Sequence, residues 1–398
     1  MSVALCLEGG SREETESSIG LTHLLEHMLF KRTLSKSTFQ LACEIDRLGG
    51  DLNASTDTDE LVLYADVPGN RFGELISLLR ELVLEPEFRQ AELDLEKEVI
   101  LQEISEANDD PDSAAFDLLS KIFWPSSSYG LPVFGTEGSV KSLSLEDLKV
   151  RLDQLRVGRR MLISVAGPVS LNVVKEAIED GFEQLEEGDF FQREAIPVKT
   201  DSSRIARGVE QCHFALGIES ASPIDEYFPA SLIVSRLLGE GMSSRLFQEV
   251  RENRGLAYDI SSQIENSLDT AMMLIRANSH PDKITEIVTI VSNQLADLWK
   301  RGPSESEIQL AKESLSAQFR MEEGVSSSLI WRMLESEQLY GRFVSASDFA
   351  RRVEECTDQE IRNFLKDQSE SPVLACVFAG AIESVDETEV EKLIEELK

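Results

Sequence analysis

Apolar and polar positions alternate along this chain in two rhythms, one typical of strands and one typical of helices. Short apolar runs bounded by turn residues predict strands, and apolar residues that recur every three or four positions predict amphipathic helices. The predicted strands span residues 3–7, 61–67, 161–167, 211–217, 258–263 and 271–277. The predicted helices span residues 20–30, 95–106, 171–184, 228–238 and 281–301. Each half of the chain therefore runs from strand to helix to turn to strand, with longer helices behind.

The chain is long enough for two domains. Its 398 residues exceed the size at which a single hydrophobic core usually stops growing. Residues 186–204 combine glycine, proline and charged side chains with little periodicity, which indicates a linker. We predict a first domain of residues 1–190, a linker of residues 191–204 and a second domain of residues 205–398.

Acidic side chains dominate the composition. The chain has 39 Lys and Arg against 73 Asp and Glu, for a net charge of −34. This charge excludes nucleic acid, whose binding needs a basic surface, and it makes an anionic membrane an equally poor partner. There is also no long uncharged apolar run to cross a membrane. The acidity either attracts basic peptides or serves solubility or adaptation to high salt, and its spread along the whole chain favours the second interpretation.

The cysteines carry little information about chemistry. The chain has five, which is an odd number, and they are widely spaced: Cys6, Cys43, Cys212, Cys356 and Cys376. This pattern predicts neither a disulfide framework nor a cysteine zinc site, and it favours a reducing compartment.

Residues 23–27 carry the candidate chemistry. They read His23-Leu24-Leu25-Glu26-His27 and hold two of the four histidines in the chain. On a helix, His23 and His27 point the same way one turn apart, and each can offer a ring nitrogen to one zinc ion at ~2.0–2.1 Å. Glu26 borders the same face, where a carboxylate can take a proton from the attacking water. This His-x-x-Glu-His order is that of the inverzincins.

A catalytic zinc needs a third protein ligand. The acidic helix predicted at residues 95–106 offers Glu96, Glu103 and Glu106. Glu96 and Glu103 are seven residues apart and so share one helical face. Acidic helices are commonly only solvated faces, so the pattern alone leaves the third ligand open. The remaining histidines, His213 and His280, are predicted to be a sheet residue and a surface turn residue.

With these residues in place, the chain resembles the pitrilysin/insulinase superfamily of zinc metallopeptidases, in its mitochondrial-processing-peptidase-like branch. That family places a glutamate about 76 residues after the second histidine, and Glu103 follows His27 by 76 residues. A second family glutamate lies seven residues earlier, where this chain has Glu96. The resemblance implies that His23, His27 and Glu103 bind one zinc ion per chain. It also implies that Glu26 is the general base and that Glu96 supports the ligands from behind.

Two further segments resemble the same family. Residues 49–56 and the following strand resemble a glycine turn and sheet edge, in which Asn53 and Ala54 would pair with an extended substrate. Residues 243–258 resemble a carboxyl-terminal signature, which implies that Arg251 and Tyr258 reach the active site and stabilise charge on the attacked carbonyl oxygen. Without the resemblance, an ordinary hairpin, a surface ion pair of Arg251 and a core position for Tyr258 would be favoured.

The fold implied by the resemblance is α+β. It consists of two homologous α/β sandwich domains, each a mixed, mostly antiparallel sheet with helices packed on one face, and only the first holds metal ligands. The implied activity is endopeptidase cleavage of short or unfolded peptides by water. In relatives of this length two chains close around the substrate. We therefore expect a homodimer in which Arg251 and Tyr258 serve the partner's zinc, with a heterodimer formed with a paralogue as the alternative.

The chain departs from the family in two places. Relatives usually begin with a further strand upstream, so we expect a truncated amino terminus here, and the protein is expected in the cytoplasm. Arg32 stands where relatives commonly have glycine, so the end of the zinc helix is expected to differ. Some relatives are non-catalytic or conditionally active partner subunits that have lost ligands. This chain keeps the ligands, so we expect an enzyme, with a partner subunit or a metal-free scaffold as the alternatives.

Overall fold

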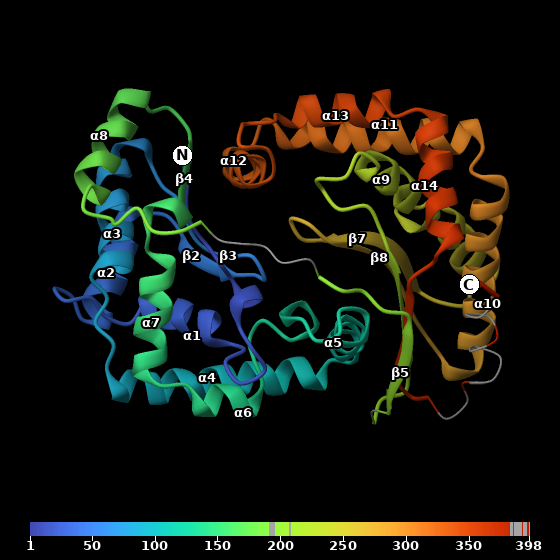
Figure 1. Ribbon diagram of the computed structural model, residues 1–398, viewed down its shortest axis with the longest axis horizontal. Helices are drawn as coiled ribbons and strands as arrows, with labels where there is room; N and C mark the ends of the chain where they lie inside the picture. The colour runs from blue at the N-terminus through green and yellow to red at the C-terminus, as the bar shows by residue number, and fades with distance from the viewer. Residues whose placement is uncertain (191–195, 207, 383–384, 386–391, 393–395, 398) are drawn as a thin grey trace. The chain divides into compact units, whose positions relative to one another are not determined.

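The computed structural model describes residues 1–398 except 191–195, 207, 383–384, 386–391, 393–395 and 398. Contacts divide the chain into two compact units (Figure 1). The first unit comprises Met1–Glu106, Leu131–Glu194 and Glu322–Val344. The second comprises Ala107–Gly130, Ala195–Met321 and Ser345–Lys398. Each unit therefore includes a segment from the other half of the chain.

The sheet of the first unit is antiparallel throughout. Its strands are β1 (Ser2–Glu8), β2 (Leu52–Thr56), β3 (Glu60–Asp66) and β4 (Met161–Ala166), in the order β2-β3-β1-β4. The register sets Leu5 of β1 opposite Leu63 of β3 and Ile163 of β4. β1 is buried along almost its whole length because it is central and covered on both faces. β2 lies at an edge of the sheet.

Helices cover both faces of this sheet. Alternate residues of a strand point to opposite faces, so Val3 and Leu5 join different layers from Ala4 and Cys6. Val3 and Leu5 belong to the large core formed with most helices of the unit, whereas Ala4 and Cys6 pack with α12. The helices are α1 (Leu21–Leu29), α2 (Thr38–Leu48), α3 (Phe72–Leu84), α4 (Gln90–Asp109), α6 (Glu137–Ser142), α7 (Leu145–Leu155), α8 (Leu171–Phe182) and α12 (Ser326–Tyr340).

The second unit is built in the same way around a mixed sheet. Its strands are β5 (Asp201–Ala206), β6 (Cys212–Glu219), β7 (Asp259–Asn266), β8 (Ala271–Ser279) and β9 (Leu374–Gly380), in the order β5-β9-β6-β8-β7. Only the β5–β9 pair is parallel among these described strands.

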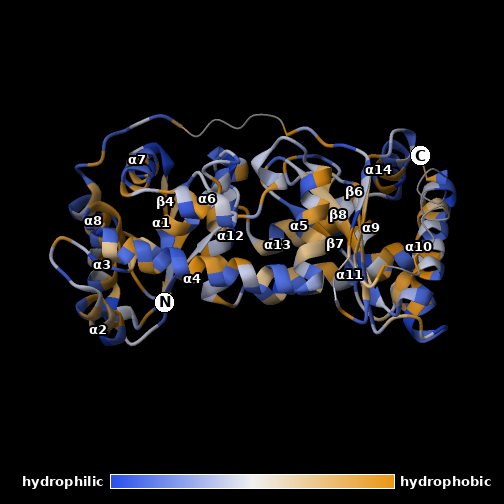
Figure 2. Cartoon of the chain, turned by 90° about the horizontal axis from the view of Figure 1, so that it is seen from below, coloured by the Kyte–Doolittle hydropathy of each residue, from blue (hydrophilic) through white to orange (hydrophobic). Residues whose placement is uncertain are grey.

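One face of the second sheet carries a large helical layer and the other carries a single helix. The large layer consists of α9 (Phe228–Gly239), α10 (Pro281–Arg301), α11 (Glu305–Glu322), α13 (Ala346–Glu355) and α14 (Asp358–Glu370). The opposite face packs against α5 (Pro111–Phe123) through Leu119 and Phe123. Figure 2 shows apolar colours on α5 and α9, on either side of the strands between them.

The predicted fold class is confirmed. The chain forms two α/β units, and the strands and helices predicted from periodicity are found with their ends shifted by a few residues. The helix predicted at 281–301 is α10 with the same bounds. The structure adds one helix on the second face of each sheet, α12 and α5, which the sequence pattern did not predict.

The predicted linker at 191–204 falls partly outside the described residues, since 191–195 are not among them. Its last residues begin β5, whose Asp201 pairs with Ala375. His213 lies buried in β6 and its Nδ1 is 2.6 Å from Oδ1 of Asp112 on α5, which agrees with a structural role. In the described part of the chain, every helix is too short or too polar to cross a membrane.

Candidate metal centre

Helix α1 carries two histidines on one face and buried apolar residues on the other. Leu24, Leu25 and Met28 are fully buried in the core of the first unit. His23 and His27 point away from that core, one turn apart, and each side chain is 17% exposed. The helix is thus held by its apolar residues, and its imidazoles are free to face a ligand.

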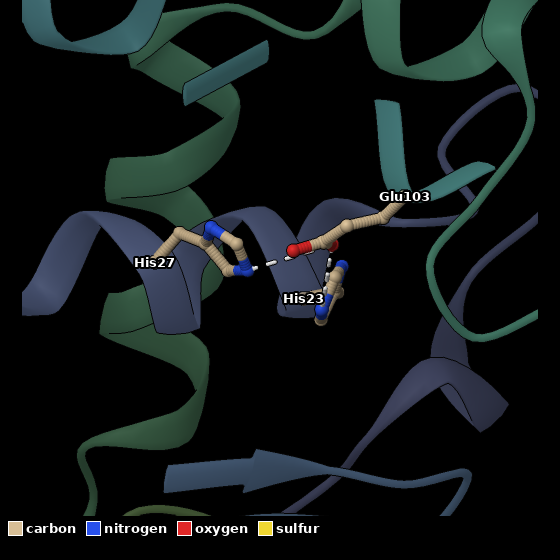
Figure 3. A group of neighbouring side chains, drawn as sticks. All are labelled: His23, His27 and Glu103. Atoms are coloured by element: carbon tan, nitrogen blue, oxygen red, sulfur yellow. Dashed lines mark ion pairs between the residues drawn. The ribbon is translucent and has the colours of Figure 1, made fainter. Parts of the chain in front are cut away.

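Helix α4 brings a carboxylate between the two rings. Leu93, Ile100 and Ile104 bury one side of α4 in the same core, which fixes its approach to α1. Oε2 of Glu103 lies 3.9 Å from Nε2 of His23 and 3.8 Å from Nε2 of His27. Figure 3 shows the Glu103 side chain reaching across α1 toward both rings.

These three side chains fit a zinc ion. Their ligand atoms all lie within 4.8 Å of one another, and among the described residues no other group of His, Cys, Asp and Glu converges in this way. Atoms bound to zinc at ~2.0–2.2 Å in a tetrahedron lie ~3.3–3.5 Å apart. The two distances from Glu103 to the histidines, 3.9 and 3.8 Å, are within a few tenths of an ångström of that spacing. Two imidazoles and one carboxylate also form a donor set typical of catalytic zinc, which leaves one position open.

Glu96 orients His27 from behind. Its Oε2 lies 3.1 Å from Nδ1 of His27, which leaves Nε2 of that ring for a metal. Its Oε1 lies 2.7 Å from Nζ of Lys31. Burial acts to raise the pKa of Glu96, but the hydrogen bonds from His27 and Lys31 outweigh it, and the pKa is lowered. The carboxylate is therefore charged at neutral pH and can hold the imidazole in place.

The two histidines differ in their surroundings. Burial lowers the pKa of His23 to about 4, so this ring is neutral at pH 7, as a metal ligand must be. Its Nδ1 is buried and has no hydrogen-bond partner among the residues that the structure describes. Burial also acts to lower the pKa of His27, but the Glu96 hydrogen bond and the charges of nearby glutamates prevail and raise it. Among the described residues, Nδ1 of His27 thus has a hydrogen-bond partner, whereas Nδ1 of His23 has none.

Glu26 lies on α1 between the two histidines. Its Oε2 accepts a hydrogen bond from Oγ1 of Thr56, at the end of β2. Burial raises the pKa of Glu26, while the Thr56 hydrogen bond and His27 act against this rise. A carboxylate with a raised pKa is a stronger base than an exposed one, which suits proton transfer.

One side of the edge strand β2, which ends beside Glu26, is not paired with another of the described strands. The amide of Asp57 donates to the carbonyl of Glu60, and the amide of Asp66 donates to the carbonyl of Asp51. Because antiparallel pairs bond at every second residue, the odd-numbered residues of β2 pair with β3. The main-chain groups of the even-numbered residues therefore face the open edge of the sheet.

Ala54 is one of these even-numbered residues. Its amide donates to Oδ1 of the neighbouring Asn53 at 2.9 Å, so a side chain occupies the place that another strand would take. Thr56, two residues further on, contacts Glu26 with its hydroxyl. An extended peptide added along this edge would thus run toward the general-base candidate.

Arg251 and Tyr258 form a group of their own in the second unit. Arg251 lies in the π-helical turn Phe247–Glu252, and its guanidinium carbon is 4.7 Å from the ring centroids of both Phe247 and Tyr258. Tyr258 is 81% exposed, so it does not fill a core. The stacked cation holds the phenol in a defined place on the surface of this unit.

The structure also reveals contacts that the sequence analysis missed. Thr56 binds Glu26, and Lys31 binds Glu96. Lys31 lies two residues past the end of α1, so helical spacing alone did not place it beside Glu96. Arg32, where the resembled family commonly has glycine, donates from Nε to Oε1 of Glu92 at 3.0 Å. The segment after α1 is thus joined to α4 by an ion pair.

Replacing Glu96 with glutamine is expected to weaken zinc binding. Glutamine keeps the shape of the side chain but loses the charge that holds His27 and Lys31. We expect the dissociation constant for zinc to rise about 10- to 100-fold, as is typical for carboxylates behind a metal ligand. Competition with a fluorescent chelator measures it. The control is Glu98→Gln on the exposed side of α4, and equal zinc affinity of both variants would argue against this role of Glu96.

Comparison with known proteins adds to this geometry. The insulinase pattern, peptidase family M16, matches residues 1–137, and the pattern described as the peptidase M16 inactive domain matches residues 142–315. An uncharacterized zinc protease of Mycobacterium bovis is 31% identical over 369 residues, which cover 90% of this chain and 84% of that protein. The uncharacterized zinc protease YmxG of Bacillus subtilis is 30% identical over 343 residues, covering 86% of this chain and 84% of the relative.

Solved structures share the fold at lower identity. The crystal structure of a peptidase M16 inactive domain from Pseudomonas fluorescens aligns with a TM-score of 0.87 at 20% identity, covering 95% of this chain and 92% of that one. The crystal structure of a protease from Helicobacter pylori aligns with a TM-score of 0.85 at 20% identity, covering 95% of this chain and 93% of that one. At 20% identity, these two structures support the fold alone.

Proposed function

The chain belongs to the insulinase family of peptidases, M16, and on that premise we propose that it is a zinc-dependent endopeptidase that cleaves short or unfolded peptides. One observation carries the proposal. Nε2 of His23, Nε2 of His27 and Oε2 of Glu103 converge from two helices, with Glu26 between the histidines on the same helix. The relatives named zinc proteases support zinc as the metal. The single converging group among the described residues supports one ion per chain.

A bound zinc ion supplies Lewis acidity at this position, which makes water more acidic and polarises a peptide carbonyl. His23, His27 and Glu103 would hold the ion, and Glu96 keeps His27 in its binding orientation through Nδ1. With three protein ligands, a bound ion would still accept a water molecule or the substrate. The residues of the chain therefore divide into ligands, a support for one ligand, and a base.

Glu26 is the general base in this proposal. Its carboxylate takes a proton from the attacking water and then delivers it to the leaving amine, so the carboxylate is regenerated at the end of each cycle. The Thr56 hydroxyl donates to Glu26 Oε2 and leaves the other oxygen for the water. Because Glu26 is carried on the same turn of α1 as His27, base and metal ligands keep a fixed separation.

Substrate binding is assigned to the edge of β2. A peptide added as a further strand would bond to the outward main-chain groups of Ala54 and its even-numbered neighbours, in place of the Asn53 side chain. Such bonds use only main-chain atoms, so they accept many sequences but need an extended chain. This requirement supports short or unfolded peptides as the substrate class.

Tyr258 and Arg251 are proposed to stabilise the negative charge that builds on the attacked carbonyl oxygen. The exposed phenol carries the donor, and the stacked Arg251 adds a positive charge beside it. We further propose a homodimer in which these residues serve the zinc of the partner chain. The proposal is supported by the presence in one chain of both the candidate metal ligands and the Arg251–Tyr258 pair.

Tyr258→Phe is expected to lower kcat about 10²- to 10³-fold, the typical effect of removing one oxyanion donor, with zinc content unchanged. Tyr227→Phe in the same unit is the control. Mixing the Tyr258→Phe and Glu26→Gln proteins after subunit exchange then tests the shared site. Random pairing leaves one intact site in half of the dimers, so about a quarter of the wild-type activity should return. Full activity of Tyr258→Phe alone would contradict the role of the phenol, and no recovery on mixing would contradict sharing.

A further inference from the structure

Helix α1 begins without a capping side chain of its own. Its N-cap position is Gly20, which has a φ of +93° and no side chain to offer. A Cβ at Gly20 would come within 2.8 Å of the carbonyl oxygen of Phe134, so a serine or aspartate does not fit there. The first amides of the metal-binding helix must therefore find acceptors elsewhere.

Glu14, in the loop before α1, supplies these acceptors. Its Oε2 accepts from the amide of Gly20 at 2.8 Å. Its Oε1 accepts from the amide of Thr22 at 2.6 Å and from the Thr22 hydroxyl at 2.5 Å. Glu14 is only 8% exposed, so this carboxylate is buried against the positive end of the helix dipole. The bonded residue, Thr22, directly precedes His23.

Arg151, on α7, binds the same Thr22 hydroxyl that donates to Glu14. Its Nε donates to the Thr22 hydroxyl at 3.0 Å, and its Nη2 donates to the carbonyls of Gly9 and Gly10 at 2.5 and 2.7 Å. The arginine is 3% exposed. Apart from a contact of Nη1 with Gln154 on its own helix, the hydrogen bonds of this buried cation go to the start of α1 or to residues 9–13 before it.

The loop held by Arg151 leads to the substrate edge. The amide of Gly9 donates to the carbonyl of Asp59, and the amide of Ser11 donates to the carbonyl of Asp57. Asp57 directly follows Thr56, whose hydroxyl binds Glu26. Gly10 packs so closely against Asp57 that an added Cβ would lie 1.9 Å from the Asp57 carbonyl oxygen. The start of α1 and the end of β2 are therefore fastened to one buried arginine.

We propose that Glu14 and Arg151 are positioning residues of the metal centre. Together with the Thr22 hydroxyl they form a clamp that fixes the first turn of α1, which carries His23, against the loop that ends β2. The clamp touches no reacting atom, so it acts through the placement of His23 and of Glu26 relative to Thr56. This inference rests on the proposed function, because it assigns the clamp to zinc binding rather than to folding alone.

Buried charged side chains are a poor device for stability alone, since apolar residues of the same size often stabilise a protein as well or better. Charged side chains do, however, offer directional bonds that a methyl group lacks. The clamp uses them on four main-chain groups, namely the amides of Gly20 and Thr22 and the carbonyls of Gly9 and Gly10. The two amides lie at the start of α1, and the two carbonyls lie in the segment that leads from β1 toward it.

Two variants test the clamp. Glu14→Gln removes the charge at the helix start, and Thr22→Val removes only the hydroxyl that joins Glu14 to Arg151. The control is Glu81→Gln. Glu81 is also 8% exposed and also accepts three hydrogen bonds, which in its case come from the side chains of Thr33, Ser35 and Lys36. All four proteins are compared at a temperature well below unfolding, by zinc competition with a chelator and by thermal unfolding with and without zinc.

We expect both clamp variants to bind zinc about tenfold more weakly than wild type. The control should lose thermal stability to a similar extent but bind zinc as wild type does. A role in folding alone would lower the unfolding temperature and leave the zinc affinity of the folded protein unchanged, and this result would overturn the proposal. If Glu14→Gln does not fold, Thr22→Val decides by the same criterion. A wild-type protein that binds no zinc would instead overturn the proposed function, and the clamp assignment with it.

Discussion

Glu26→Gln is expected to lower kcat about 10²- to 10⁴-fold, the range that a positioned proton-transfer group contributes. Glutamine has nearly the shape of glutamate and can still accept from the Thr56 hydroxyl, but it cannot take a proton from water. The variant should fold and bind zinc as wild type does, because Glu26 is not among the three converging ligands. Initial rates on an unstructured peptide, with zinc content measured on the same samples, give both quantities.

The control for this substitution is Glu16→Gln, which makes the same chemical change at an exposed position before α1. Its rate and zinc content should match wild type. A Glu26→Gln protein that keeps both its zinc and most of its kcat would show that another group moves the proton. Burial raises the pKa of Glu26, so the lost group is a stronger base than an exposed glutamate, and water should not replace it efficiently.

His27→Ala is expected to abolish both zinc binding and peptidase activity. The substitution removes one of two nitrogen ligands and also leaves Glu96, which is 6% exposed, with Lys31 as its remaining charged partner. The protein should still fold, since the buried residues of α1 are Thr22 and the apolar Leu24, Leu25, Met28 and Leu29, and these are unchanged. Metal analysis, circular dichroism and the rate on a peptide report these three properties.

Thermal unfolding gives a further readout for His27→Ala. A ligand that binds only the native state raises the unfolding temperature in proportion to the logarithm of its concentration. Wild type should therefore gain stability with added zinc, and His27→Ala should not. His280→Ala is the control, because His280 lies exposed at the start of α10 and bonds locally to Asp282. One zinc per chain retained by His27→Ala, with normal activity, would place the metal elsewhere.

The sequence predicted the part of the site that lies within one helix. His23, Glu26 and His27 are local in sequence, so helical spacing alone puts them on adjoining parts of one face. Glu103 is different, because its contact with the histidines spans two helices, and in an acidic chain many glutamates had equal claims. The resemblance to a family selected Glu103, and the distances of 3.8 and 3.9 Å to the two rings agree with that choice.

The exchange of α5 and α12 between the two units shows what periodicity leaves out. Ile330 and Leu334 are one turn apart on α12, and this spacing predicts that one face of the helix is buried. The spacing does not predict which sheet will cover that face. The structure packs it on Ala4 and Cys6 of β1, more than 300 residues earlier in the chain. Tertiary partners of an amphipathic helix are a property of the whole fold.

Side-chain hydrogen bonds across elements escaped prediction for the same reason. Thr56 and Glu26 lie 30 residues apart, and Arg151 and Thr22 lie 129 apart. Neither pair has a spacing that any regular element would produce. Such polar contacts are found only when the backbone of the surrounding fold is known, whereas the two histidines of the candidate ligand set follow from residue type and local spacing.

Zinc-dependent cleavage by the unmodified chain is the most direct test of the account. Metal-free protein would be titrated with zinc in the presence of a pool of unstructured peptides, and the products read by mass spectrometry. The account predicts no cuts without metal, and cuts that increase until one zinc is bound per chain. Cuts that do not depend on metal, or no cuts when one zinc is bound per chain, would contradict a zinc peptidase that works without a second kind of subunit.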